Sequence, residues 1–199
     1  MSSLLDVLTQ SLGGSAVEQI SRKLGANPQT VEQALPSALG TLVVGLSRNS
    51  ASSGGAEALA GALSRDHDGS ILDNLGGFLN DPEGGPGEGI LGHVLGSKRP
   101  AVESGLSSST GLDATTVTKL LTMLAPIVMG ALGRTQRQQG LDVGGLASML
   151  AGEREQIGRA APAALGGLER ILDTDGDGQV ADAVAKLGAG LLGRFFGRK

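Results

Sequence analysis

An aspartate- and glycine-rich segment near the C-terminal end is the part of the sequence best suited to bind a metal ion. Residues 173–180 match the first eight positions of an EF-hand loop, with carboxylates at positions 1, 3 and 5 and glycine at position 6. An EF-hand also needs a bidentate glutamate at position 12, where the chain has Val184. Asp182, at position 10, could replace it only with a different loop geometry. The segment predicts either turn and helix-cap chemistry without metal or a weak Ca²⁺ site, whose ligands would be Asp173, Asp175, Asp177, Gln179 and Asp182.

A second loop carries a weaker form of the same pattern. It has Asp66, Asp68 and Asp73 at positions 3, 5 and 10, but Ser64 at position 1. Residues 70–73 also resemble a capping box, with aspartate in place of the usual glutamate. We therefore expect this loop to cap a helix rather than to bind Ca²⁺.

The residues needed for catalysis are sparse. The chain has two histidines, His67 and His93, and no cysteine, which excludes disulfides, thiol catalysis and zinc–thiolate sites. His93 lies among apolar residues, where a histidine is more often packed and bonded to the backbone than catalytic. No serine or acidic residue stands beside it in sequence, and no glycine-rich stretch ends in Gly-Lys-Ser or Gly-Lys-Thr as a phosphate-binding loop does. We expect a protein that is not an enzyme and has no cofactor besides the Ca²⁺ considered above.

The C-terminal tail, residues 193–199, differs from the rest of this acidic chain because it combines aromatic and basic side chains. One interpretation is a helix end whose aromatic rings pack on the core and whose cations suit the helix dipole. The other is docking, to an apolar groove of a partner or to an anionic membrane surface. The candidate partner-binding residues are Arg194, Phe195, Phe196 and Arg198.

Composition limits the classes of protein to consider. The formal net charge is −4, which disfavours nucleic acid as a partner. The N-terminus lacks the features of a signal peptide, and the longest apolar run, 123–132, is well short of the roughly 20 residues that span a bilayer. We therefore expect a soluble, cytoplasmic protein without a membrane span. The 34 glycines, many of them in helical patterns, predict closely crossing helices.

The periodicity of apolar residues predicts an all-α fold. Apolar positions recur at helical spacing almost throughout, and nothing alternates with a period of two over a useful length. Two long apolar helices, one after Asn27 and one over 114–137, are expected at the centre. The sequence further predicts a flexible connector at 50–55, a helix at 71–79, a break at 80–89, separate short helices at 145–150 and 153–160, and a last helix at 180–192.

Two parts of the chain resemble each other. Residues 24–31 and 110–117 each run from a glycine through an Asn or Asp cap into a Thr-Val pair, and each continues into a long apolar helix. This predicts two pseudo-repeated helical halves around the two long helices. The expected organisation is a first half at 1–80, a connector at 81–89, a second half at 90–192 and the basic tail at 193–199.

The first of these repeats also has the spacing of a DNA-reading helix-turn-helix, with Gly25 in the turn. A recognition helix must expose polar or basic side chains to base edges. Here the second helix offers Gln29, Glu32 and Gln33 and then becomes apolar. We expect two packed helices, and DNA association remains an alternative.

Three stretches together resemble the bacterial DUF937 family, which is related to YidB-like proteins. They are residues 89–96 (GILGHVLG), 109–113 (STGLD) and 120–132 (LLTMLAPIVMGAL), and the Asp-Gly loop near the C-terminus accompanies them. The resemblance implies a multihelical fold and a bacterial source, and it implies no catalytic residue.

These observations favour a non-enzymatic helical scaffold or interaction protein. It would act through self-association, as a homo-oligomer, or by binding a protein partner, because duplicated helical units can stack or pair. The alternatives are a calcium-responsive module that uses the 173–177 loop and a DNA-associated helix-turn-helix-like protein.

Overall fold

The computed structural model describes residues 3–80 and 85–172, and within these ranges every regular element is a helix. The predicted all-α fold is therefore confirmed. The helices are α1 (Leu4–Ser11), α2 (Ser15–Leu24), α3 (Pro28–Asn49), α4 (Ser53–Asp66), α5 (Leu75–Asn80), α6 (Gly87–Leu95), α7 (Arg99–Thr110), α8 (Ala114–Gln139), α9 (Val143–Ala160) and α10 (Pro162–Leu172), with 3₁₀ turns η1 (Ser70–Leu72) and η3 (Gly96–Lys98).

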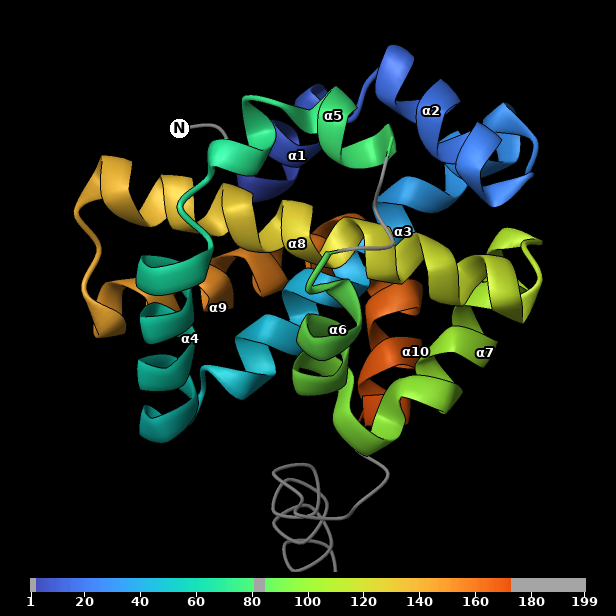
Figure 1. Cartoon of the computed structure of the whole chain (residues 1–199). Coiled ribbons are helices and arrows are strands. Elements are labelled where there is room, and N and C mark those ends of the chain that lie inside the picture. Colours follow the sequence, from blue (N-terminus) through green and yellow to red (C-terminus); the bar gives the residue numbers. More distant parts are fainter. Residues whose placement is uncertain (1–2, 81–84, 173–199) are drawn as a thin grey trace, which may run out of the picture.

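The two long apolar helices lie at the centre, as predicted. Figure 1 shows α8 across the middle of the molecule, with α1, α2 and α5 on one side and α4, α6 and α7 on the other. Most of α3 from Ala38 to Ser47 is buried, and so is α8 from Met123 to Gly133. Because each helix is covered on nearly all sides, neither needs a polar face over these stretches.

In length and composition, α8 would be able to cross a bilayer. Its best 18-residue window has a mean hydropathy of 1.5, and 78% of that window is buried inside the protein. Burial of this extent is the pattern of a core helix. The absence of a membrane span remains a prediction.

Both long helices begin at side-chain caps that the sequence predicts. The Asn27 side chain accepts a hydrogen bond from the backbone N–H of Gln29 at 2.9 Å, and Asp113 accepts one from the N–H of Thr116 at 3.0 Å. The glycines before the caps, Gly25 and Gly111, have φ of 66° and 75°, a left-handed conformation that glycine adopts without a Cβ penalty. Each repeat therefore has a left-handed glycine followed by a side-chain cap, although the cap bond spans two residues at Asn27 and three at Asp113. The larger pseudo-repeat remains a prediction.

Several expected boundaries were wrong. The segment 50–55 is not wholly a connector, because Ser52 caps α4 by accepting from the N–H of Gly55 at 3.1 Å and the helix begins at Ser53. The helix expected at 71–79 is the short turn η1 followed by α5. The expected break at 80–89 ends earlier, since α6 begins at Gly87. The two helices expected at 145–150 and 153–160 are one continuous α9.

Two glycines allow neighbouring backbones to approach α8 unusually closely. A Cβ at Gly133 would overlap the carbonyl oxygen of His67, at the end of α4. A Cβ at Gly87, in the first turn of α6, would overlap the carbonyl oxygen of Thr122. Both collisions involve backbone atoms, which cannot move aside by a rotamer change. The close crossings expected from the glycine content are therefore found here.

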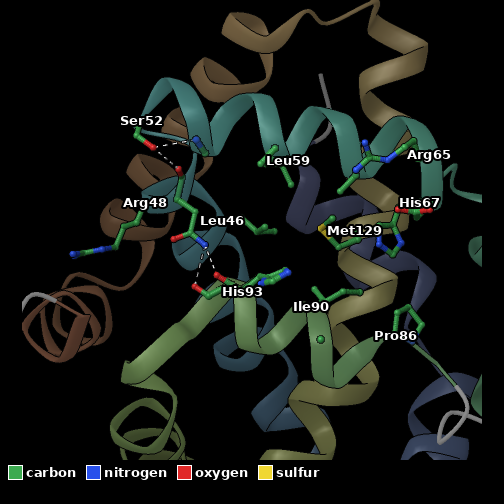
Figure 2. A pocket seen from close by; sticks show the side chains of 17 residues that line it. Leu46, Arg48, Ser52, Leu59, Arg65, His67, Pro86, Ile90, His93 and Met129 are labelled. Atoms are coloured by element: carbon green, nitrogen blue, oxygen red, sulfur yellow. Dashed lines mark hydrogen bonds between the residues drawn. The ribbon is translucent and has the colours of Figure 1, made fainter.

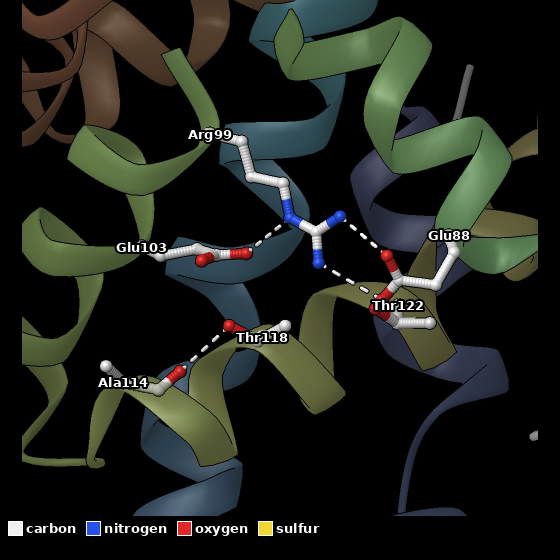
Figure 3. A network of polar contacts seen from close by, with 6 residues as sticks. All are labelled: Glu88, Arg99, Glu103, Ala114, Thr118 and Thr122. Carbon is white, nitrogen blue, oxygen red and sulfur yellow. Dashed lines mark hydrogen bonds and ion pairs between the residues drawn. The ribbon is translucent and has the colours of Figure 1, made fainter. Parts of the chain in front are cut away.

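A polar network fastens α6 and α7 to α8 (Figure 3). The Arg99 guanidinium pairs with Glu88 at 2.6 Å and with Glu103 at 2.7 Å, and Thr122 donates to Glu88 at 2.8 Å. Hydrogen bonds from Arg99 and Thr122 lower the pKa of Glu88, and the bonds to Glu88 and Glu103 raise that of Arg99. The Arg99–Glu103 pair is screened less by salt than a surface ion pair because both of its side chains are mostly shielded from water, whereas Glu88 is exposed.

One hydrophobic core unites both predicted halves. It takes in Leu8 and Ile20 from the first half and Leu106 and Leu150 from the second, together with both central helices. A buried carboxylate also joins the halves: Glu153, 6% exposed, accepts a hydrogen bond from the N–H of Leu4 at 2.7 Å. The two halves therefore share a single core.

Candidate functional site

A groove of about 900 Å³ lies between α4 and α6, and we call it the α4–α6 groove. The helices α4 and α6 form its walls, and the end of α3 and the middle of α8 contribute to its floor (Figure 2). Ligand-binding pockets have volumes of roughly 300–1,000 Å³, so the groove is large enough for a small molecule or for side chains of a partner. The lining residues are Leu46, Arg48, Asn49, Ser52, Gly55, Ala58, Leu59, Ala62, Arg65, Asp66, His67, Pro86, Gly89, Ile90, His93, Val94 and Met129.

The floor of the groove is apolar and tightly held. Leu46 comes from α3, Leu59 from α4, Ile90 and Val94 from α6, and Met129 from α8, and all five belong to the buried hydrophobic residues. Side chains from four helices meet there, so the floor is fixed by the packing of the whole core. An apolar ligand would therefore meet a surface that already exists without it.

A set of hydrogen bonds fixes the end of α3 between the two walls. The Asn49 side-chain amide donates to the backbone oxygens of His93 at 2.8 Å and Val94 at 3.3 Å, both in α6. The Ser52 hydroxyl donates to the Asn49 backbone oxygen at 3.4 Å and caps α4. These bonds satisfy backbone groups near the helix ends and set the position of each wall relative to α3.

The polar rim holds three nitrogen-bearing side chains from the two walls. Arg65 lies in the last turn of α4, His67 follows that helix directly, and His93 lies on the exposed side of α6. Burial lowers the pKa of His67, partly offset by the neighbouring Asp66 carboxylate, which favours a neutral imidazole at pH 7. The rim on the α4 and α6 walls therefore combines the Arg65 guanidinium with two imidazoles above an apolar floor, and Arg48 from the end of α3 also lines the groove.

The comparison with known families gives one match. Residues 6–135 match DUF937, described as bacterial proteins of unknown function. The chain belongs to the DUF937 family. No curated protein and no solved structure is significantly similar to it.

The DUF937 match includes every residue that lines the groove, because the lining runs from Leu46 to Met129. It ends at residue 135, before α9 begins at Val143. The expectation that the resemblance extends to the Asp-Gly loop near the C-terminus is therefore not supported by the matched range. The groove, in contrast, lies wholly within the DUF937 region.

The loop after α4 does not form the predicted capping box. Asp68 accepts from the N–H of Ser70 at 2.9 Å, and hydrogen bonds from the Ser70 side chain and backbone lower its pKa. Asp73 instead pairs with Arg134 of α8 at 2.5 Å, and Arg134 also donates to the Gly69 backbone oxygen at 2.7 Å. In residues 3–80 and 85–172, no group of three or more potential metal ligands comes together. This loop is a turn held by an arginine of the central helix.

The other predicted sites lie outside the described residues. They are the Ca²⁺ ligands Asp173, Asp175, Asp177, Gln179 and Asp182, and the partner-binding tail residues Arg194, Phe195, Phe196 and Arg198. Both sites stay predictions.

The helix-turn-helix candidate is a packed pair of helices. Gln29, Glu32 and Gln33 are exposed, but Val31, Ala34 and Leu35 on the other face of α3 are buried in the core. The exposed part of α3 is therefore short, and DNA association remains an untested alternative.

The residues that sequence reasoning missed are those of the groove. His93 was expected to be packed, but its side chain is exposed at the rim and only its backbone oxygen is bonded, to Asn49. His67 and His93, 26 positions apart in sequence, line the same groove because α4 and α6 both flank the end of α3. The sequence contains only a weak indication of the groove: its two histidines lie at the end of one helix and within another.

Proposed function

We propose that this DUF937 protein is a non-enzymatic binding protein that acts by association, and that the α4–α6 groove is where its partner or ligand is held. The observation that carries the proposal is the apolar floor, built from four helices and left open between two helical walls. Concave sites with an apolar lining and a few polar groups are the usual form of a binding site.

The polar groups of the rim support binding rather than catalysis. Ser52, the hydroxyl side chain in the lining, is engaged in capping α4 and in a bond to Asn49. A nucleophile needs a base within hydrogen-bond reach, and no such pair of side chains is among the bonds of the described lining residues. An apolar floor fixed by the core suits a protein that holds a molecule without changing it.

Two matched glycines in α6 allow the proposal to be tested. Gly89 and Gly92 are both exposed, and a Cβ at either meets nothing within 4 Å. Gly89 lines the groove and Gly92 does not. Gly89→Phe should therefore fill the groove while Gly92→Phe places the same side chain on the same helix outside it.

The experiment measures fluorescence of the neutral apolar dye Nile red with the full-length protein and both variants. We expect saturable dye binding by the wild type and Gly92→Phe, and its loss in Gly89→Phe with an unchanged melting temperature. Equal dye binding by all three proteins would overturn the proposal.

Sedimentation of the same proteins tests which partner is involved. If Gly89→Phe alone reduces a concentration-dependent mass, the occupant of the groove is a second copy of this chain. If the mass is independent of concentration in all three proteins, self-association through the groove is excluded and a different molecule occupies it.

A further inference from the structure

We infer that the ligand of the α4–α6 groove is an acyl chain that ends in a carboxylate. This inference rests on the proposed function and adds the chemical class of the ligand. Two properties of the groove carry it: the apolar floor and a single arginine on the rim that has no ion pair.

Arg65 is that arginine. It is exposed, and within the described residues neither an ion pair nor a side-chain hydrogen bond engages its guanidinium. The head group lies beside Gly61, one turn back along α4, where a Cβ would be 3.7 Å from Nη1. The missing side chain at Gly61 leaves room for the guanidinium to fold back along α4, at the edge of the groove that Arg65 lines. Arg48, the other arginine of the lining, points away from the groove in Figure 2.

The charges around the rim favour one negative charge on the ligand. Asp66 is the acidic member of the lining, but it adjoins Arg65 in sequence, and residues i and i+1 do not face each other on a helix. Asp66 also lines a neighbouring cavity of about 350 Å³ on the far side of His67. Because burial lowers the pKa of His67, that ring is a neutral hydrogen-bonding group at pH 7. With Arg48 directed away from the groove, the Arg65 guanidinium and the neutral His67 imidazole match a monoanion better than a phosphate dianion.

A carboxylate fits a guanidinium in a further respect. The planar fork of arginine donates two parallel hydrogen bonds to the two carboxylate oxygens, an arrangement that also fixes the direction of the ligand. With the head group at Arg65, the chain would extend over Leu59 and Ile90 toward Leu46, along the apolar floor. The groove therefore has a polar end and an apolar remainder, as a carboxylate with a long acyl chain requires.

The test compares three ten-carbon probes by isothermal titration calorimetry with the full chain: decanoate, the neutral alcohol decan-1-ol and the cation decylammonium. We expect decanoate to bind about tenfold more tightly than decan-1-ol, as one charge-assisted hydrogen-bonded pair would give, and decylammonium to bind most weakly. Arg65→Gln should reduce decanoate affinity to that of decan-1-ol and leave decan-1-ol unchanged. The matched control Arg159→Gln, at an exposed arginine of α9 outside the groove, should leave both affinities unchanged.

The outcomes separate this inference from the proposed function. If decanoate and decan-1-ol bind equally in the wild type, or if Arg65→Gln leaves decanoate unaffected, the carboxylate preference is overturned while the groove remains a binding site. If Gly89→Phe reduces the binding of none of decanoate, decan-1-ol and Nile red, both the inference and the proposed function fail.

Discussion

Because the end of α4 lies so close to α8, we predict that a side chain at Gly133 destabilises the fold. An added Cβ would overlap the carbonyl oxygen of His67 and would lie 3.1 Å from its carbonyl carbon. Both are backbone atoms, so relief requires the end of α4 to withdraw from α8. Overpacking of this kind costs about 1–3 kcal/mol and sometimes more.

The net effect of Gly133→Ala follows from two opposed terms. Replacing a helical glycine by alanine stabilises the helix by about 1 kcal/mol. Since the collision is with backbone, we place its cost at the upper end of the range and expect a net loss of about 2 kcal/mol. For a chain of this length that lowers the melting temperature by about 4–8 °C.

Gly152→Ala is the matched control. Gly152 lies within α9, and a Cβ there meets nothing within 4 Å. The same substitution should therefore raise the melting temperature by about 2–4 °C, because only the propensity term acts. Circular dichroism at 222 nm during heating measures both. A Gly133→Ala protein as stable as the wild type, beside a stabilised Gly152→Ala, would refute the close approach of α4 to α8.

Three further predictions concern separate features. Arg99→Met leaves the half-buried Glu103 without its partner and should lower the free energy of unfolding in urea by about 2 kcal/mol. Arg159→Met, at an exposed pair, should lower it by less than about 0.5 kcal/mol. Equal effects of the two substitutions would contradict the role given to the Arg99 network. Hydrogen bonds from Thr116 lower the pKa of Asp113 from 3.8, so its contribution to stability is present above pH 3.8 and is lost as pH falls through its lower folded-state pKa. The melting temperature of the wild type should therefore exceed that of Asp113→Asn at pH 7, and the difference should narrow as pH falls below 3.8. If the segment 173–182 binds Ca²⁺, calorimetric titration with millimolar Ca²⁺ should give heat with the wild type and none with Asp175→Asn, and no heat with either protein leaves only cap chemistry.

The local signals in the sequence predicted much of the fold because they act over a few residues. Asn27 and Asp113 cap helices through their own side chains, and each needs only the next three residues to do so. The glycines at 54–55 led to a wrong prediction, because they favour a connector where the structure has the first turn of α4. Gly152 lies between the two helices expected at 145–150 and 153–160, but the burial of Leu150 and Glu153 on either side of it stabilises one continuous helix.

The groove could not be predicted in the same way. Its walls are brought together by the contacts of α8 with both α4 and α6, by those of α3 with α6, and by the bonds from Asn49 to the backbone of α6. No periodicity within α4 or α6 indicates which helix lies opposite. The two histidines become neighbours of one cavity only through these long-range contacts.

The bond between Glu153 and Leu4 sets an order for events during synthesis of the chain. The two residues are 149 positions apart, so the first helix is made long before the carboxylate that caps it. At synthesis rates of about 5–20 residues per second, that interval is roughly 7–30 s. The apolar face of α1, with Leu4 and Leu8, packs on α3 and α8, and both of these helices are made before Glu153. The N-terminal helix can therefore pack before its first backbone N–H finds its buried partner, and this bond is among the last contacts of α1 to form.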